Sequence, residues 1–73
     1  MGLTASDAKT LIVNGEPREI VAKNLAEALA ALDYADAIVA TALNGEFVPA
    51  RKRDAAGLKE GDRIEIVAPR QGG

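Results

Sequence analysis

The sequence contains no histidine and no cysteine, and its single serine is Ser6. These absences remove the commonest general base, the thiolate nucleophile and the usual zinc ligands, and they exclude a Ser-His-Asp triad. We therefore expect a protein that has no catalytic residues of its own, is not an enzyme and binds no metal. The lack of cysteine also suits a reducing compartment, so we expect a cytoplasmic location.

Aromatic residues are scarce, and no strong positive charge replaces them. Tyr34 and Phe47 are the only rings, and the formal net charge is −2. Two rings are too few for a base-stacking platform and the charge opposes phosphate binding, so we expect no nucleic acid partner. No apolar run approaches the ~18 residues that a membrane-spanning helix needs, so we expect no membrane partner either.

The overall composition is that of an ordinary globular protein. The 73 residues are 48% hydrophobic and 27% charged, which is typical of one small domain. A domain of this size buries only about 60% of its unfolded surface, so it needs a regular fold around one core. We assign 1–8 to a flexible leader, 9–68 to the folded domain and 69–73 to a flexible tail.

The pair Asn14-Gly15 predicts a tight hairpin turn, because a primed turn needs positive φ at both central positions. The turn joins a strand at 9–13 to a second strand at 18–21. Since proline cannot donate to a sheet ladder, we assign Pro17 to the turn and not to the strand.

A helix is predicted to begin at Asn24, with Glu27 three residues later as in a capping box. Apolar residues follow at the i, i+3, i+4 and i+7 spacing of one helix face: Leu25, Ala28, Leu29 and Leu32. We expect the helix to end at 32–34.

The second half of the chain has a second Asn-Gly turn, at Asn44-Gly45, between a strand at 38–43 and a short strand around Phe47-Val48. Pro49 ends that strand, and the charged segment 50–56 is expected to be a loop.

The last predicted strand, 63–67, alternates polar and apolar residues. This period predicts that Ile64 and Ile66 face the core, while Arg63 and Glu65 face outward. Leu58 is expected to be a buried anchor in the connection before this strand.

The element order is therefore β-β-α-β-β-β, which indicates an α+β fold. One helix across one face of a small mixed sheet buries the apolar faces of both. The crossover allows the first and last strands to pair in parallel at the sheet centre. This arrangement is a β-grasp, or ubiquitin-like, fold.

The sequence ends in Gly72-Gly73. No side chain blocks attack at the last carbonyl carbon, and glycine accepts backbone angles that a narrow channel would impose. The alternative is an ordinary frayed terminus.

Three segments, taken in order with the terminal glycines, make the chain similar to the ThiS family of sulfur carrier proteins. The segments are 13–16 (Val-Asn-Gly-Glu), 43–49 (Leu-Asn-Gly-Glu-Phe-Val-Pro) and 58–67 (Leu-Lys-Glu-Gly-Asp-Arg-Ile-Glu-Ile-Val). The resemblance covers about 9–73. The leader is extra, and Ala50 follows Val-Pro where the family often has arginine.

The resemblance implies a role as a protein cosubstrate in thiamine biosynthesis. A ThiF-like adenylating enzyme would use ATP and Mg²⁺ to activate the carboxylate of Gly73. Sulfur from a cysteine desulfurase relay would then give a thiocarboxylate, from which a ThiG-like thiazole synthase takes the sulfur. The chain itself would bind no cofactor.

The residues before Gly73 are expected to enter a partner active site. Gly72 would be the slim link, with Gln71, Arg70 and Pro69 as the rest of the stalk. Pro69 blocks continuation of the strand ladder. Arg70 either pairs with a partner carboxylate or phosphate or is a solvated surface residue.

Two surface features complete the prediction. An apolar partner patch is predicted from Phe47 and Val67 with Ala40 or Ala42, although core packing of Phe47 is an equal alternative. The basic cluster 51–53 is interpreted as a solvated loop in preference to a docking site.

Three other functions remain open from the sequence. Two keep the terminal chemistry: a MoaD-like sulfur carrier for molybdopterin synthesis and a ubiquitin-like modifier of lysines. The third is a β-grasp module that binds protein or RNA through its sheet face, with incidental glycines. Deletion of Gly72-Gly73 would separate the binding module from the carriers, because only a binding module would keep its function.

Overall fold

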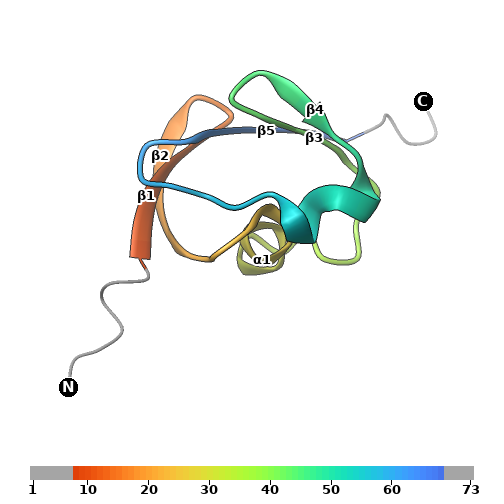
Figure 1. Ribbon diagram of the computed structural model, residues 1–73, viewed down its shortest axis with the longest axis horizontal. Helices are drawn as coiled ribbons and strands as arrows, with labels where there is room; N and C mark the ends of the chain where they lie inside the picture. Colours follow the sequence, from red (N-terminus) through yellow and green to blue (C-terminus); the bar gives the residue numbers. More distant parts are fainter. Residues whose placement is uncertain (1–7, 69–73) are drawn as a thin grey trace.

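The computed structural model describes residues 8–68, so the predictions for the tail 69–73 and for the leader 1–8, apart from Ala8, lie outside the described residues. Ala8 does not belong to a leader, because it pairs with Val21 in the first strand. Figure 1 shows two hairpins with one strand between them, and a helix on one side of the sheet. The elements are β1 (Ala8–Val13), β2 (Glu16–Val21), α1 (Leu25–Ala31), β3 (Ala40–Leu43), β4 (Glu46–Val48), the 3-10 helix η2 (Ala50–Ala55) and β5 (Arg63–Val67).

The five strands form one mixed sheet in the order β2-β1-β5-β3-β4. β1 and β5 are parallel, while the β1–β2, β3–β4 and β3–β5 pairs are antiparallel. The predicted β-grasp arrangement is therefore confirmed, with the first and last strands adjacent in the sheet. β5, the strand that leads to the tail, has a neighbour on each side.

Both Asn-Gly turns have the predicted backbone. Asn14 and Gly15 have φ of 51° and 87°, and Asn44 and Gly45 have φ of 52° and 87°. Positive φ at both central positions is the primed geometry that suits the right-handed twist of the flanking strands.

The assignment of Pro17 to the turn is wrong. Pro17 lies in β2, opposite Ile12 and one pair beyond the closing pair of Val13 with Glu16. Pairs in an antiparallel hairpin alternate between bonded and non-bonded, so the nitrogen of Pro17 points away from β1. β2 is an edge strand, where a missing N–H on the outer side costs no ladder bond.

The start of α1 follows the prediction closely. The Asn24 side chain accepts a 2.8 Å hydrogen bond from the Glu27 N–H. The Glu27 carboxylate in turn accepts a 2.8 Å bond from the backbone N–H of Lys23, one residue before the cap. The first bond satisfies a helix N–H that has no partner within the helix, and the second joins Glu27 to the residue before the cap, where a standard capping box would use the Asn24 N–H.

The helix ends in a Schellman motif built on Asp33, which has φ of 72°. Its N–H donates to the Ala30 carbonyl at 3.1 Å, and the Tyr34 N–H donates to the Leu29 carbonyl at 2.7 Å. Glycine is the usual residue at this left-handed position, so an aspartate there is strained.

Asp33→Gly is therefore expected to raise the free energy of unfolding by about 0.5–1 kcal/mol. The change relieves the left-handed strain and removes a negative charge from a helix C-terminus. Asp36→Gly is the matched control, because Asp36 is exposed and is absent from the residues with positive φ. Urea unfolding should show a gain for the first variant and a small loss for the second; a loss for both would contradict the prediction.

β3 is shorter than predicted, beginning at Ala40 and not at Ile38. The described pairing of β3 with β5 ends at Ala40 opposite Val67, and Ile38 is 84% exposed. Ahead of it, the Ala37 N–H donates to the Tyr34 carbonyl in a turn. Ile38 has strand propensity but no partner strand among the described residues.

The segment expected to be a loop forms η2, and Arg53 within it is not simply solvated. The Arg53 Nε donates to the Thr41 hydroxyl at 3.0 Å, and its terminal nitrogen donates to the Val39 carbonyl at 2.7 Å. The hydroxyl of Thr41, which is 2% exposed, donates a hydrogen bond to the Val48 carbonyl at 2.8 Å. Arg51 and Lys52 remain exposed.

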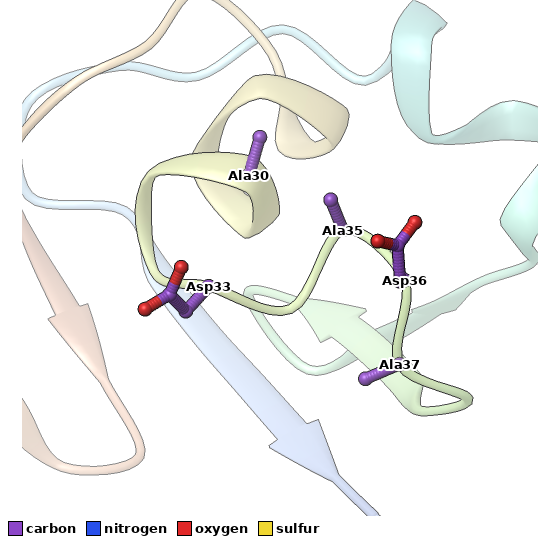
Figure 2. Close-up of a pocket in the computed structure, with 5 residues that line it drawn as sticks. All are labelled: Ala30, Asp33, Ala35, Asp36 and Ala37. Atoms are coloured by element: carbon purple, nitrogen blue, oxygen red, sulfur yellow. The ribbon is translucent and has the colours of Figure 1, made fainter.

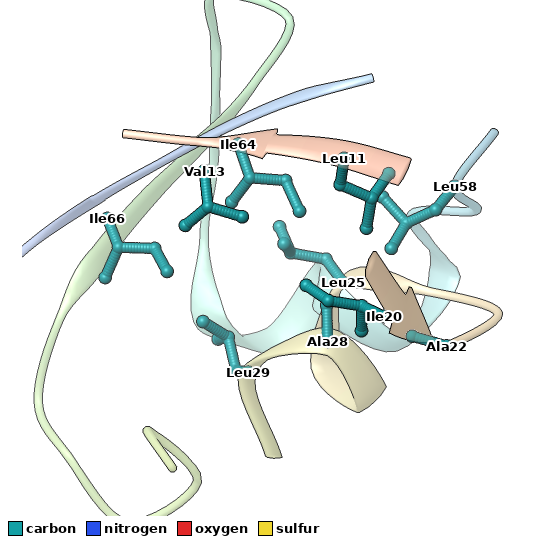
Figure 3. Packing of buried hydrophobic residues seen from close by; sticks show 10 residues of the cluster. All are labelled: Leu11, Val13, Ile20, Ala22, Leu25, Ala28, Leu29, Leu58, Ile64 and Ile66. Atoms are coloured by element: carbon teal, nitrogen blue, oxygen red, sulfur yellow. The ribbon is translucent and has the colours of Figure 1, made fainter. Parts of the chain in front are cut away.

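The core lies between the sheet and α1, as Figure 3 shows for side chains from both layers. Ile64 and Leu11 from the sheet and Leu25 from the helix have no exposed surface. Leu58 is buried as predicted. The buried cluster comprises Leu11, Val13, Ile20, Ala22, Leu25, Ala28, Leu29, Leu58, Ile64 and Ile66.

Candidate functional site

The candidate site begins where β5 ends, because the chain continues from there to the terminal glycines. Val67 closes β5, and Ala68 is the last residue described. The predicted stalk and reactive end lie outside the described residues: Pro69, Arg70, Gln71, Gly72 and Gly73. The structure therefore describes the end of β5, the strand that precedes the tail, and its surroundings.

On the β1 side, the end of β5 is held by Asn14. Its N–H donates to the Ile64 carbonyl at 2.9 Å. Its side-chain oxygen accepts a 2.8 Å bond from the Ile66 N–H, and its side-chain nitrogen donates to the Ile66 carbonyl at 3.2 Å. One turn residue thus satisfies both backbone groups of Ile66.

On the β3 side, Asn44 binds the start of β5 in a similar way. Its N–H donates to the Arg63 carbonyl at 2.7 Å, and its side-chain oxygen accepts a 2.9 Å bond from the Arg63 N–H. Its side-chain nitrogen donates to Asp62 at 3.0 Å. The two Asn-Gly turns therefore hold β5 at opposite ends.

The four residues of the predicted patch lie on the sheet face that points away from α1. Phe47 is 68% exposed and Val67 is 63% exposed, so Phe47 does not pack in the core. Ala42 pairs with Phe47 on one side and Glu65 on the other, and Ala40 pairs with Val67. Strand pairing thus brings the predicted residues together on β3, β4 and β5.

An apolar hollow of about 310 Å³ adjoins this patch. Its lining consists of Ile38, Val39, Ala40 and Val67. Val67 and Ala40 belong to both features, so the hollow opens where the chain leaves β5. The sequence did not predict this hollow, because Ile38 was assigned to a strand. Ile38 is exposed since the described β3–β5 pairing stops at Ala40.

A second hollow, of about 320 Å³, lies at the end of α1 (Figure 2). Alanines and two carboxylates line it: Ala30, Asp33, Ala35, Asp36 and Ala37. Figure 2 shows the two carboxylate groups on well-separated parts of the loop. The lining offers no nucleophile paired with a base, and it shares no residue with the hollow at Val67.

Among residues 8–68, no group of three or more potential metal ligands lies together. No helix in that same part of the chain has the length and apolar character that a bilayer crossing requires.

The comparisons with known proteins agree with this geometry. The family model for the ThiS family matches residues 11–73. The chain belongs to the ThiS family. Its structure is similar to the crystal structure of a thiamine biosynthesis protein (ThiS) from Geobacter metallireducens, with a TM-score of 0.74 and 37% identity over 88% of this chain and 99% of that one. No curated protein sequence matches the chain.

For this ThiS family member, the matched region contains both Asn-Gly turns, β5 and the diglycine. Sequence reasoning grouped the four patch residues that strand pairing brings together, and its tail remains a prediction, but it missed the side-chain roles of Asn14, Asn44 and Arg53. The Asn-Gly pairs were interpreted through backbone φ alone. That interpretation does not indicate where an asparagine amide will bind.

Proposed function

We propose that the protein is a sulfur carrier of thiamine biosynthesis that holds the transferred sulfur on the carboxyl group of Gly73. The observation that carries the proposal is the family match, which runs to residue 73 and so includes the diglycine. The similar Geobacter protein is itself named as a thiamine biosynthesis protein.

The chemistry requires activation, because a carboxylate is a poor acyl donor. On a ThiF-like enzyme, a carboxylate oxygen of Gly73 attacks the α-phosphate of ATP and pyrophosphate leaves. The outer sulfur of a persulfide, supplied through a cysteine desulfurase relay, then attacks the acyl carbon, and AMP leaves with one former carboxylate oxygen. A thiol of the partner proteins cleaves the resulting acyl disulfide, which leaves a disulfide on the partner side and the thiocarboxylate on Gly73. The thiocarboxylate that results is a soft nucleophile for a ThiG-like thiazole synthase.

This division of roles suits the composition of the chain. The partners supply the ATP site, the Mg²⁺ and the catalytic side chains, while the carrier supplies a reacting atom on a thin stalk. Since the sequence has no histidine or cysteine, the carrier cannot offer a thiol or imidazole that would compete for the activated carbonyl. In this role the protein is a cosubstrate that is consumed and regenerated.

A docking surface supports the proposal: the outer-face patch, formed by Phe47, Val67, Ala40 and Ala42 on the sheet face that points away from α1. Phe47 and Val67 are large exposed apolar residues on the side of the sheet that α1 leaves open. A partner that covers this patch would meet the chain as it leaves β5. Such a partner could bury the patch and receive the tail at the same time.

Intact-mass measurement tests the proposal directly. The full chain is incubated with ATP, Mg²⁺, a ThiF-type enzyme and a sulfide source, beside a matched chain that lacks Gly73. The expected result is a mass gain equal to one oxygen replaced by sulfur, located on the C-terminal peptide of the full chain alone. Transfer from this product to thiazole synthase, and not to molybdopterin synthase, identifies the pathway.

No mass gain, with an enzyme that modifies a known carrier in parallel, would overturn the proposal. A gain that persists without Gly73 would move the reacting group elsewhere in the chain. Retained partner binding without any modification would favour the β-grasp binding module.

A further inference from the structure

We propose that Asn14 is a positioning residue, whose side-chain amide fixes the direction in which the C-terminal segment leaves β5. This inference rests on the proposed carrier function, because it concerns how the tail reaches an activating enzyme. It is carried by the hydrogen bonds of Asn14 and by the place of β5 in the sheet.

The hydrogen bonds between the β1 side and β5 continue beyond Val13, the last residue of β1. The Ile12 N–H donates to the Asp62 carbonyl and the Asn14 N–H donates to the Ile64 carbonyl, both at 2.9 Å. The next rung falls at Ile66, but β1 has ended at Val13 and the chain has entered the turn. The Asn14 amide supplies that rung, since it carries the same donor and acceptor as a peptide group.

This added rung lies next to the point of departure. Ile66 precedes Val67, the last residue of β5, and Val67 pairs with Ala40 on the β3 side. Without the Asn14 amide, the described end of β5 would be held by β3 alone. A strand bonded on one side only opens more easily than a strand bonded on both.

Small movements at this point matter because the reacting atom is distant. Gly73 follows Ile66 by seven residues. A stretch of that length spans at most about 25 Å, so the position of Ile66 sets the centre of the region that Gly73 can reach. Fixing the base reduces the range of directions that the enzyme must select from.

Asn44 provides a matched control within the same molecule. It is the same residue type, in the same kind of turn, with φ of 52° against 51° for Asn14. Its side chain also makes two hydrogen bonds, but to Arg63 and Asp62 at the start of β5. Glycine at either position keeps the positive φ and removes only the amide.

The test compares Asn14→Gly with Asn44→Gly in the full-length protein. Urea midpoints measure stability, and pyrophosphate exchange with a ThiF-type enzyme measures KM and kcat for the carrier, at a temperature where every variant is folded. Both midpoints are expected to fall by similar amounts. Asn14→Gly is expected to raise KM roughly 3- to 10-fold with little change in kcat, because only alignment is lost. Asn44→Gly is expected to leave KM within about twofold of the wild type.

Hydrogen exchange gives a readout that needs no enzyme. The Ile66 amide is expected to exchange faster in Asn14→Gly, and the Arg63 amide in Asn44→Gly. An unchanged KM in Asn14→Gly, or an equal rise in both variants, would overturn the positioning role while leaving the carrier function intact. A wild-type chain that supports no exchange would instead overturn the proposed function, and the positioning role with it.

Discussion

Replacing Ile64 by alanine is expected to lower the free energy of unfolding by about 3–4 kcal/mol, through lost burial and the cavity that remains. Ile64 has no exposed surface and pairs with Val13 in β1 and Leu43 in β3. The total free energy of unfolding of a 73-residue domain is roughly 4–11 kcal/mol, so this substitution removes a large share of the stability. Urea unfolding followed by circular dichroism measures the loss.

Val67→Ala is the control within the same strand. Val67 is 63% exposed, so its truncation is expected to cost less than about 1 kcal/mol. Equal losses for the two variants would mean that β5 contributes through its strand propensity and not through the buried core.

Replacing Phe47 by alanine is expected to weaken binding of the activating enzyme about tenfold or more, provided that the outer-face patch is the docking surface. Phe47 is the largest exposed apolar residue of the patch and is 68% exposed. Its removal should leave the urea midpoint almost unchanged, because it contributes nothing to the buried cluster. Titration calorimetry of carrier against enzyme measures the affinity.

Two valines on the same sheet face make the control for this effect. Val67 and Val21 are both 63% exposed, but Val21 lies in β2, at the far edge of the sheet from β4. Val67→Ala should weaken binding and Val21→Ala should not. Equal effects from both, or none from Phe47→Ala, would remove the patch from the interface.

The features that sequence reasoning predicted correctly depend on neighbours a few residues apart. The alternation at Ile64 and Ile66, the Asn-Gly turns and the cap at Asn24 each have their cause within a short stretch of chain. The pairing of the first and last strands then followed, because a crossover between them makes them parallel. These elements were sufficient to predict the β-grasp fold.

The errors came from residues whose state depends on distant partners. Pro17 is tolerated in a strand only because β2 lies at the sheet edge. Ile38 lies outside a strand because the described β3–β5 pairing stops before it. Arg53 binds Thr41, which is 12 residues away, and Asn14 binds Ile66 across 52 residues. No local pattern indicates such contacts.

The central position of β5 also determines when a newly made chain can fold. The ribosome synthesises β5 after the other four described strands, yet β5 lies between β1 and β3 in the sheet. Until β5 has left the ribosome, Ile64 and Ile66 cannot pack against the rest of the buried cluster, so the core cannot form completely. Completion of the fold is thus coupled to synthesis of the strand from which the chain continues to Gly72-Gly73. A folded carrier is one whose translation has already passed β5.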